Sequence, residues 1–97
     1  MIQATFKQNH DGIYWYQVAG HAFHAPSGTD IVCAGVSSLY ITVTNELLKF
    51  GRTFERDEGY FVLDGGLKEQ VCLDVLKNGL ESIAENYPEN ITVKVIE

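Results

Sequence analysis

The sequence contains no CxxC motif, and cysteine occurs at only two of its 97 positions, Cys33 and Cys72. A zinc site of the finger type needs closely spaced ligand pairs, so this class of structural site is not expected. Two isolated cysteines in a reducing cytosol are expected to remain thiols rather than form a disulfide. No repeat, low-complexity segment or linker interrupts the chain, and its length fits one domain over residues 1–97.

Positive charge is also scarce. The chain has 7 lysines and arginines against 13 aspartates and glutamates, which gives a net charge of −6. An acidic surface repels phosphate backbones, so direct binding to nucleic acid is not expected, whereas a basic partner would suit it. The first residues turn polar before an apolar signal segment forms, and no apolar run reaches the length of a membrane span. We therefore expect a cytoplasmic protein with no membrane partner and no cofactor.

Apolar residues spaced by three or four predict two helices. Residues 30–50 form the first, with Asp30 as its N-cap and Gly51 just past its end. Its early turns are apolar on nearly every side, so we expect it to be deeply buried. Residues 67–87 form the second helix. The expected apolar face of that helix consists of Val71, Val75, Leu76, Leu80, Ile83, Ala84 and Tyr87.

Alternating and β-branched segments predict five strands. Residues 2–8 and 13–22 flank a turn with Gly12 and make a first hairpin. A second hairpin is expected over residues 53–66, and residues 91–97 alternate cleanly as a last strand. The order ββαββαβ indicates an α+β fold, with two helices packed on a mostly antiparallel sheet.

Residues 20–39, GHAFHAPSGTDIVCAGVSSL, contain the best candidates for chemistry. If Asp30 caps the helix, Cys33 lies in its first turn, where unpaired N–H groups and the helix dipole favour a thiolate. Small neighbours such as Ala34 would let another chain approach. His21 ends the preceding strand and is a candidate base for the Cys33 proton. Packing roles stay open here, with Cys33 as a small core residue and His21 as a polar strand-end residue.

The neighbours of Cys33 have more than one role open to them. Asp30 could cap the helix, orient His21, or do both. Ser37 lies one helical turn after Cys33, where it could bind substrate or the backbone. A metal site formed by His21, His24 and Cys33 is the less favoured alternative, because this spacing matches no recognised zinc motif.

The pattern GHA followed by DIVCAGVS resembles the signature of a bacterial family, the ribosomal-processing cysteine proteases called Prp. The matching residues are Gly20, His21, Asp30, Ile31, Val32, Cys33, Ala34, Val36 and Ser37. The likeness extends over the whole chain and includes the opening strand, both long helices and the closing strand.

This resemblance implies an endopeptidase that cuts a short N-terminal extension from a large-subunit ribosomal protein (L27 type). It makes Cys33 the nucleophile and His21 the general base, and it implies a homodimer and a loop over the substrate between these two residues. The N–H groups of Cys33 and Ala34 are candidates to stabilise the oxyanion. Supporting or substrate-binding roles are implied for Gly20, Asp30, Ala34 and Ser37. The alternative is a non-enzymatic acidic module that binds a basic ribosomal partner.

Overall fold

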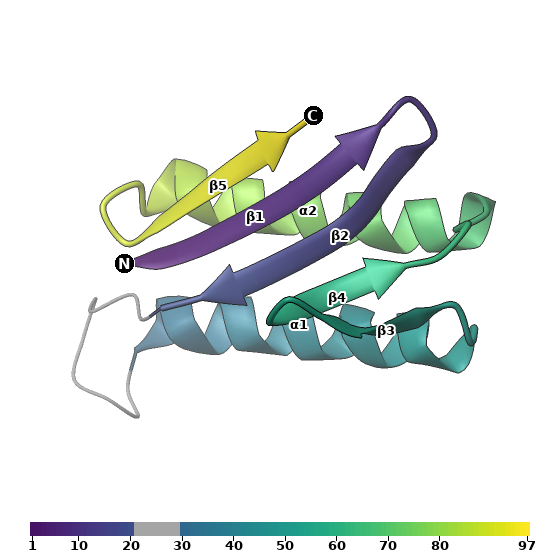
Figure 1. Cartoon of the computed structure of the whole chain (residues 1–97). Helices are drawn as coiled ribbons and strands as arrows, with labels where there is room; N and C mark the ends of the chain where they lie inside the picture. Colours follow the sequence, from purple (N-terminus) through teal and green to yellow (C-terminus); the bar gives the residue numbers. More distant parts are fainter. Residues whose placement is uncertain (21–29) are drawn as a thin grey trace.

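Five strands form one sheet, and two helices cover one of its faces (Figure 1). The computed structural model describes residues 1–20 and 30–97. The elements are β1 (Ile2–Asn9), β2 (Gly12–Ala19), α1 (Ile31–Lys49), β3 (Thr53–Arg56), β4 (Gly59–Val62), α2 (Leu67–Asn86) and β5 (Ile91–Ile96). The predicted α+β class and the order ββαββαβ are confirmed.

The strand order in the sheet is β3-β4-β2-β1-β5. All neighbours are antiparallel except β1 and β5, which run parallel, and the N–H of Ile2 donates to the carbonyl oxygen of Asn90 at 2.9 Å. The two predicted hairpins, β1–β2 and β3–β4, are present. They differ in length, and the arrowhead of β2 extends past the β3–β4 turn in Figure 1.

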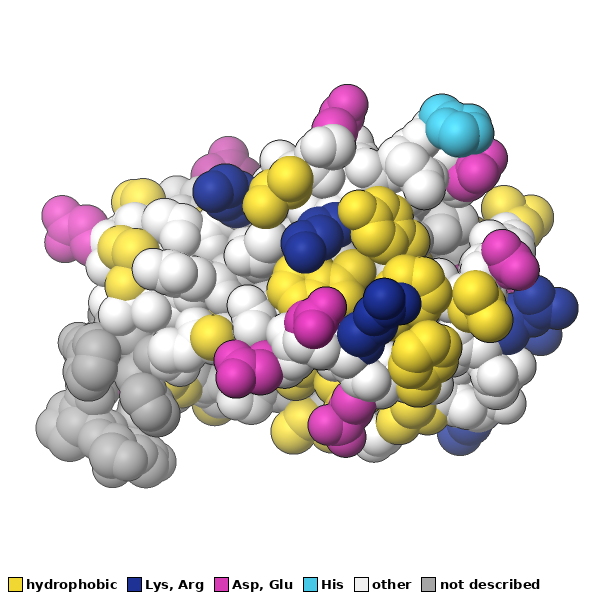
Figure 2. Space-filling model, viewed as in Figure 1, with side chains coloured by type: hydrophobic (Ala, Val, Ile, Leu, Met, Phe, Trp, Pro, Cys, Tyr) yellow, Lys and Arg dark blue, Asp and Glu magenta, His cyan; other side chains and the backbone are white. Residues whose placement is uncertain are grey.

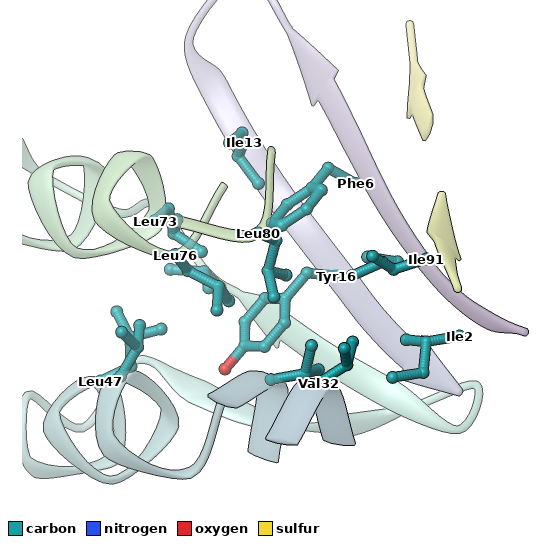
Figure 3. Packing of buried hydrophobic residues seen from close by; sticks show 14 residues of the cluster. Ile2, Phe6, Ile13, Tyr16, Val32, Leu47, Leu73, Leu76, Leu80 and Ile91 are labelled. Atoms are coloured by element: carbon teal, nitrogen blue, oxygen red, sulfur yellow. The ribbon is translucent and has the colours of Figure 1, made fainter. Parts of the chain in front are cut away.

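The core lies between the sheet and the helices. Figure 3 shows side chains from β1, β2, β5 and both helices converging around Tyr16. The Tyr16 hydroxyl shares a buried hydrogen bond of 2.7 Å with the Thr44 hydroxyl, so the polar atom in this apolar region has a partner. Side chains with no more than 2 % exposure include Phe6, Tyr16, Val32, Leu47, Val62, Leu73, Leu76, Leu80 and Ile91.

Helix α1 begins and ends where the sequence predicts. Asp30 is its N-cap, and Gly51 follows the C-cap with φ +80°, a conformation that glycine adopts without a steric penalty. The expected deep burial holds for one face of α1 only, because Ile31 and Ile41 are 61 % and 56 % exposed. The sheet and α2 cover one face of the helix and leave the opposite face to solvent.

By length and composition alone, α1 could cross a membrane, since it has 19 residues and an 18-residue window within it has a mean hydropathy of 1.4. The expectation that no apolar run reaches that length is therefore wrong. A helix packed on a protein core passes the same test. Val32, Val36, Val43 and Leu47 of α1 are buried in the core described above.

The apolar face predicted for α2 is confirmed at Leu76, Leu80, Ile83, Ala84 and Tyr87, and it is wrong at its first two members. Leu73, Leu76 and Leu80 are fully buried, whereas Val71 and Val75 are each 52 % exposed. The predicted face combined members of two apolar stripes, and only one of them packs against the sheet. At the start of α2, a carboxylate oxygen of the buried Glu69 accepts a hydrogen bond from the Gly66 N–H at 3.1 Å.

The sheet face that the helices leave uncovered carries a row of paired side chains across four strands. Cross-strand pairing places Lys7, Trp15, Phe61 and Phe54 in register. The Lys7 ammonium lies 4.5 Å from the Trp15 ring, and the Trp15 indole N–H donates to the Arg56 carbonyl oxygen at 2.8 Å. Figure 2 shows the hydrophobic and basic side chains gathered on this face.

Candidate active site

Cys33 is the third residue of α1, and Asp30 organises the turn around it. Asp30 Oδ1 accepts hydrogen bonds from the N–H groups of Val32 at 2.9 Å and Cys33 at 3.1 Å. The carbonyl oxygen of Asp30 accepts from the Ala34 N–H at 3.1 Å. Asp30 is 9 % exposed, so this cap is almost out of solvent. The predicted capping role of Asp30 is confirmed.

This arrangement argues against one sequence-based expectation. The N–H groups of Cys33 and Ala34 were candidate donors to an oxyanion, but each already donates to an oxygen of Asp30. An oxyanion donor must carry a proton that is available to substrate. The capped turn therefore supplies position and a positive dipole at Cys33 rather than these two N–H groups.

A pocket of about 430 Å³ opens between the end of β2 and the first half of α1. It brings together Gly20, Cys33 and Ser37, three of the residues singled out in the sequence. The other walls come from Ile2, Val18, Val36 and Tyr40. These walls are largely apolar, so the pocket suits an apolar side chain next to the Cys33 thiol. His21 and His24 lie outside the described residues.

Gly20 has a steric reason to be glycine. Its φ is +94°, and a Cβ at this position would collide with the carbonyl oxygen of Met1. A residue with a side chain would strain the backbone and push the ends of β2 and β1 apart. Gly20 therefore lets the end of β2 lie close against the start of β1, at the rim of the pocket.

Tyr40 forms one wall of the pocket and was not singled out in the sequence. Its ring contacts those of Tyr16 and Tyr60, with centroid distances of 5.9 Å and 6.2 Å. Burial, and next the neighbouring Tyr60, raises the pKa of Tyr40, so its hydroxyl stays protonated. The signal was available: Cys33, Ser37 and Tyr40 are spaced by four and three residues and share one face of a helix.

Cys72 lies in a different environment. It is half-buried on α2 and lines a separate pocket with Phe50 and Lys68. Burial, followed by the carboxylates of Glu46 and Glu69, raises the pKa of the Cys72 thiol. The Cys72 side chain packs against the core, and neither cysteine takes part in a disulfide, as expected from the sequence.

Within residues 1–20 and 30–97, no group of three or more histidine, cysteine, aspartate or glutamate side chains is placed to hold a metal ion. That finding does not test the metal site considered from the sequence, which consists of His21, His24 and Cys33. Two of its three members fall outside the described residues.

Comparison with known proteins identifies the family. The family model of the cysteine protease Prp matches residues 1–92. The chain belongs to the Prp family of cysteine proteases. It is 32 % identical to the ribosomal processing cysteine protease Prp of Bacillus subtilis, and the match covers 96 % of each chain.

Solved structures agree with this assignment. The essential ribosomal processing protease Prp from Staphylococcus aureus, in complex with a covalently linked product peptide, superposes with a TM-score of 0.84 at 26 % identity. That match covers 98 % of this chain and 99 % of the other. A protein of Streptococcus mutans superposes with a TM-score of 0.74 at 32 % identity, over 99 % and 94 % of the two chains. Family membership decides between the two classes considered from the sequence, and the chain is a cysteine protease.

Proposed function

We propose that the chain removes a short N-terminal extension from a large-subunit ribosomal protein of the L27 type. The proposal rests on the names of its relatives, which are ribosomal processing proteases, and on one structural observation. Cys33 lies in the first turn of α1 and also lines a largely apolar pocket. A thiol at the positive end of a helix, beside room for a substrate side chain, suits nucleophilic attack on a peptide bond.

In the proposed mechanism, His21 takes the proton of the Cys33 thiol. The thiolate attacks the scissile carbonyl carbon and forms a tetrahedral oxyanion. The protonated imidazole then gives its proton to the leaving amine, and a thioester to Cys33 remains. Water attacks this thioester, the product acid leaves, and the thiol is restored. The covalently linked product peptide in the Staphylococcus aureus relative is consistent with such an intermediate.

Ser37 is the candidate to contact the reacting carbonyl oxygen. It lines the same pocket as Cys33 and carries a hydroxyl proton, whereas the first-turn N–H groups of Cys33 and Ala34 donate to Asp30. Loss of one oxyanion donor costs roughly 100- to 1000-fold in kcat. Ser37→Ala should therefore lower kcat more than it raises KM, while Ser37→Thr should restore part of the loss.

The deciding experiment is a cleavage assay on the ribosomal protein that carries its extension. The masses of both products should show a single cut in the parent chain. Cys33→Ser and His21→Ala should lose this cut, whereas Cys72→Ala, the matched cysteine control, should keep it. Cleavage by Cys33→Ser at the parental rate would overturn the assignment of the nucleophile.

The histidine pair separates this mechanism from metal-dependent hydrolysis. His24→Ala should keep most of the activity that His21→Ala loses, and chelators should have no effect. Equal losses at both histidines, together with inhibition by a chelator, would instead favour a metal site formed by His21, His24 and Cys33.

We further propose that the chain acts in the cytoplasm as a homodimer, and that it binds neither nucleic acid nor membranes directly. Large apolar side chains of both helices are exposed, and their burial against a second chain would favour self-association. They include Ile31, Ile41, Leu48, Leu67, Val71 and Val75. Light scattering coupled to size-exclusion chromatography tests the dimer, and a mass of one chain at all concentrations would exclude it.

A further inference from the structure

The edge of β2 beside the candidate active site has no strand partner within the described residues. On that side, β4 is the neighbour of β2, and their pairing consists of Trp15 with Phe61 and Tyr16 with Tyr60. The opposite edge of β2 continues to pair with β1 as far as Ala19. As Figure 1 shows, the β3–β4 hairpin turns back while β2 continues toward the start of α1.

The register identifies which backbone groups face this edge. The Ile2 N–H donates toward β5, so the backbone groups of the next residue, Gln3, face β2 and its partner Ala19. Neighbouring residues in a strand direct their N–H and C=O groups to opposite sides. The N–H and C=O of Val18 therefore face away from β1. They lie on the side of the β3–β4 hairpin, beyond Tyr16, which is the last residue of β2 that pairs with β4.

The same residue borders the pocket that holds Cys33. Val18 pairs with the buried Ala4 on the inner side of the sheet, and its side chain lines the pocket of about 430 Å³. A residue placed directly opposite Val18 on an added strand would point its side chain to the same face. A residue placed opposite Val18 can therefore form hydrogen bonds with both backbone groups of Val18. In the same position it directs its side chain into the pocket beside Cys33.

The charge around the open edge indicates the composition of the segment that fits there. The β3–β4 turn carries the exposed residues Asp57 and Glu58, and the Glu58 carbonyl oxygen accepts a hydrogen bond of 3.4 Å from the Gln17 side chain. This bond places the acidic turn next to Gln17, the residue before Val18. Arg56 does not neutralise the edge, because its guanidinium lies 5.0 Å from the Phe61 ring on the outer face of the sheet.

We propose that substrate binds as an added antiparallel strand on this edge, in the direction that β4 takes. One apolar residue of the substrate exchanges both backbone hydrogen bonds with Val18 and places its side chain in the pocket with Cys33. A basic residue on its C-terminal side meets Asp57 and Glu58. This mode of binding rests on the proposed function, because it identifies the occupant as the segment that is cut. Pairing with a strand edge gives affinity, and the pocket gives specificity.

A backbone-modified peptide series tests the register without altering the protein. The probe is a synthetic peptide that spans the junction of the ribosomal extension, N-methylated at one non-scissile position at a time. Methylation of the residue opposite Val18 should lower kcat/KM by about tenfold or more, because it removes a donor and adds bulk at the strand edge. Replacement of that same residue by aspartate should cause a similar loss, while methylation of its two neighbours should change kcat/KM by less than about twofold. Equal tolerance at all positions would overturn the proposal.

Val18→Pro tests the same contact from the protein side. Proline is tolerated on a strand edge whose N–H faces solvent, so the substitution removes the donor without breaking a sheet hydrogen bond. The comparison is Val18→Thr, which alters the side chain but keeps the N–H. We expect kcat/KM of the proline variant to lie about tenfold or more below that of the threonine variant. Equal values in two folded variants would refute the pairing, and the peptide series decides the matter if the proline variant does not fold.

Binding measurements separate this proposal from the proposed function. The same peptides are titrated into Cys33→Ala, which lacks the nucleophile, and the dissociation constants are read by fluorescence anisotropy. If the parent does not cut the peptide, yet the methylation pattern appears in binding, the strand pairing holds and the proposed reaction fails. If the parent cuts the peptide and no such pattern appears, the reaction holds and the pairing is wrong. Absence of any binding would overturn the pairing in either case.

Discussion

Replacement of Asp30 by alanine should measurably weaken the fold, because this side chain secures the turn that carries Cys33. Its Oδ1 atom accepts two N–H groups, at 2.9 Å and 3.1 Å, in a site that is 9 % exposed. Loss of an N-cap acceptor costs about 1 kcal/mol. Loss of a negative charge at a helix N-terminus adds about 0.3–1 kcal/mol. We therefore expect Asp30→Ala to lower the free energy of unfolding by about 1.3–2 kcal/mol.

Asp30→Asn is the matched control, since it keeps an oxygen acceptor at the cap and removes the negative charge. Its expected cost is about 0.3–1 kcal/mol. Urea unfolding followed by the fluorescence of the single tryptophan, Trp15, measures both variants. The protein concentration must be fixed, because a dimer gains stability with concentration. For a chain of this size, the alanine variant should melt roughly 5–16 °C lower than the parent. The cap would not stabilise the fold as argued if the alanine variant were as stable as the parent, or if the asparagine variant were as unstable as the alanine variant.

Three further results are expected. Gly20→Ala should destabilise the fold by at least about 1 kcal/mol, because φ is +94° and the new methyl group meets the Met1 carbonyl; an unchanged melting temperature would contradict this. Burial raises the pKa of Tyr16 above its ordinary 10.0, so the unfolded chain loses this proton first. The contribution of Tyr16 to stability should therefore be intact below pH 10.0 and fall above it. The parent should show the phenolate absorbance of Tyr16, identified by its absence in Tyr16→Phe, only as the chain unfolds. Burial, and next Glu46, raises the pKa of Cys72, so Glu46→Gln should speed its alkylation, as followed by mass spectrometry, and an unchanged rate would exclude the carboxylate effect.

The start of α1 could be predicted from sequence because its determinants are local. An aspartate that caps a helix must lie just before the first turn, and this places Cys33 three residues later whatever the rest of the chain does. The strands and turns followed from similar short-range signals. Gly20, Cys33 and Ser37, which were singled out in the sequence, line one pocket, whereas His21 lies outside the described residues.

The faces of the helices depend on contacts that the sequence does not reveal. Helix α2 has two apolar stripes, one through Leu73, Leu76 and Leu80 and one through Val71 and Val75. Both have helical spacing, so periodicity alone cannot choose between them. The choice is made by the approach of α1 and the sheet, which is a tertiary property.

The remaining pocket walls were missed for a related reason. Ile2 and Val18 come from two strands, and they meet Cys33 only because the ends of β1 and β2 lie over the start of α1. The open edge beyond Tyr16 likewise depends on how far the short β3–β4 hairpin reaches along β2. No local signal in either segment encodes that difference in length.

The parallel pairing of β1 with β5 sets the order in which a newly made chain can mature. β1 precedes the other four strands in the sequence, yet its partner on one side is the last of the five, residues Ile91–Ile96. Ile91 can be buried, and the hydrogen bond from Ile2 to Asn90 can form, only after residues 90 and 91 have been translated. Until then the nascent β1–β2 hairpin keeps an unpaired edge, and the sheet is completed only once residues 91–96 have been translated. Contacts between such distant residues also slow folding, so the interval before the protease becomes competent is built into its topology.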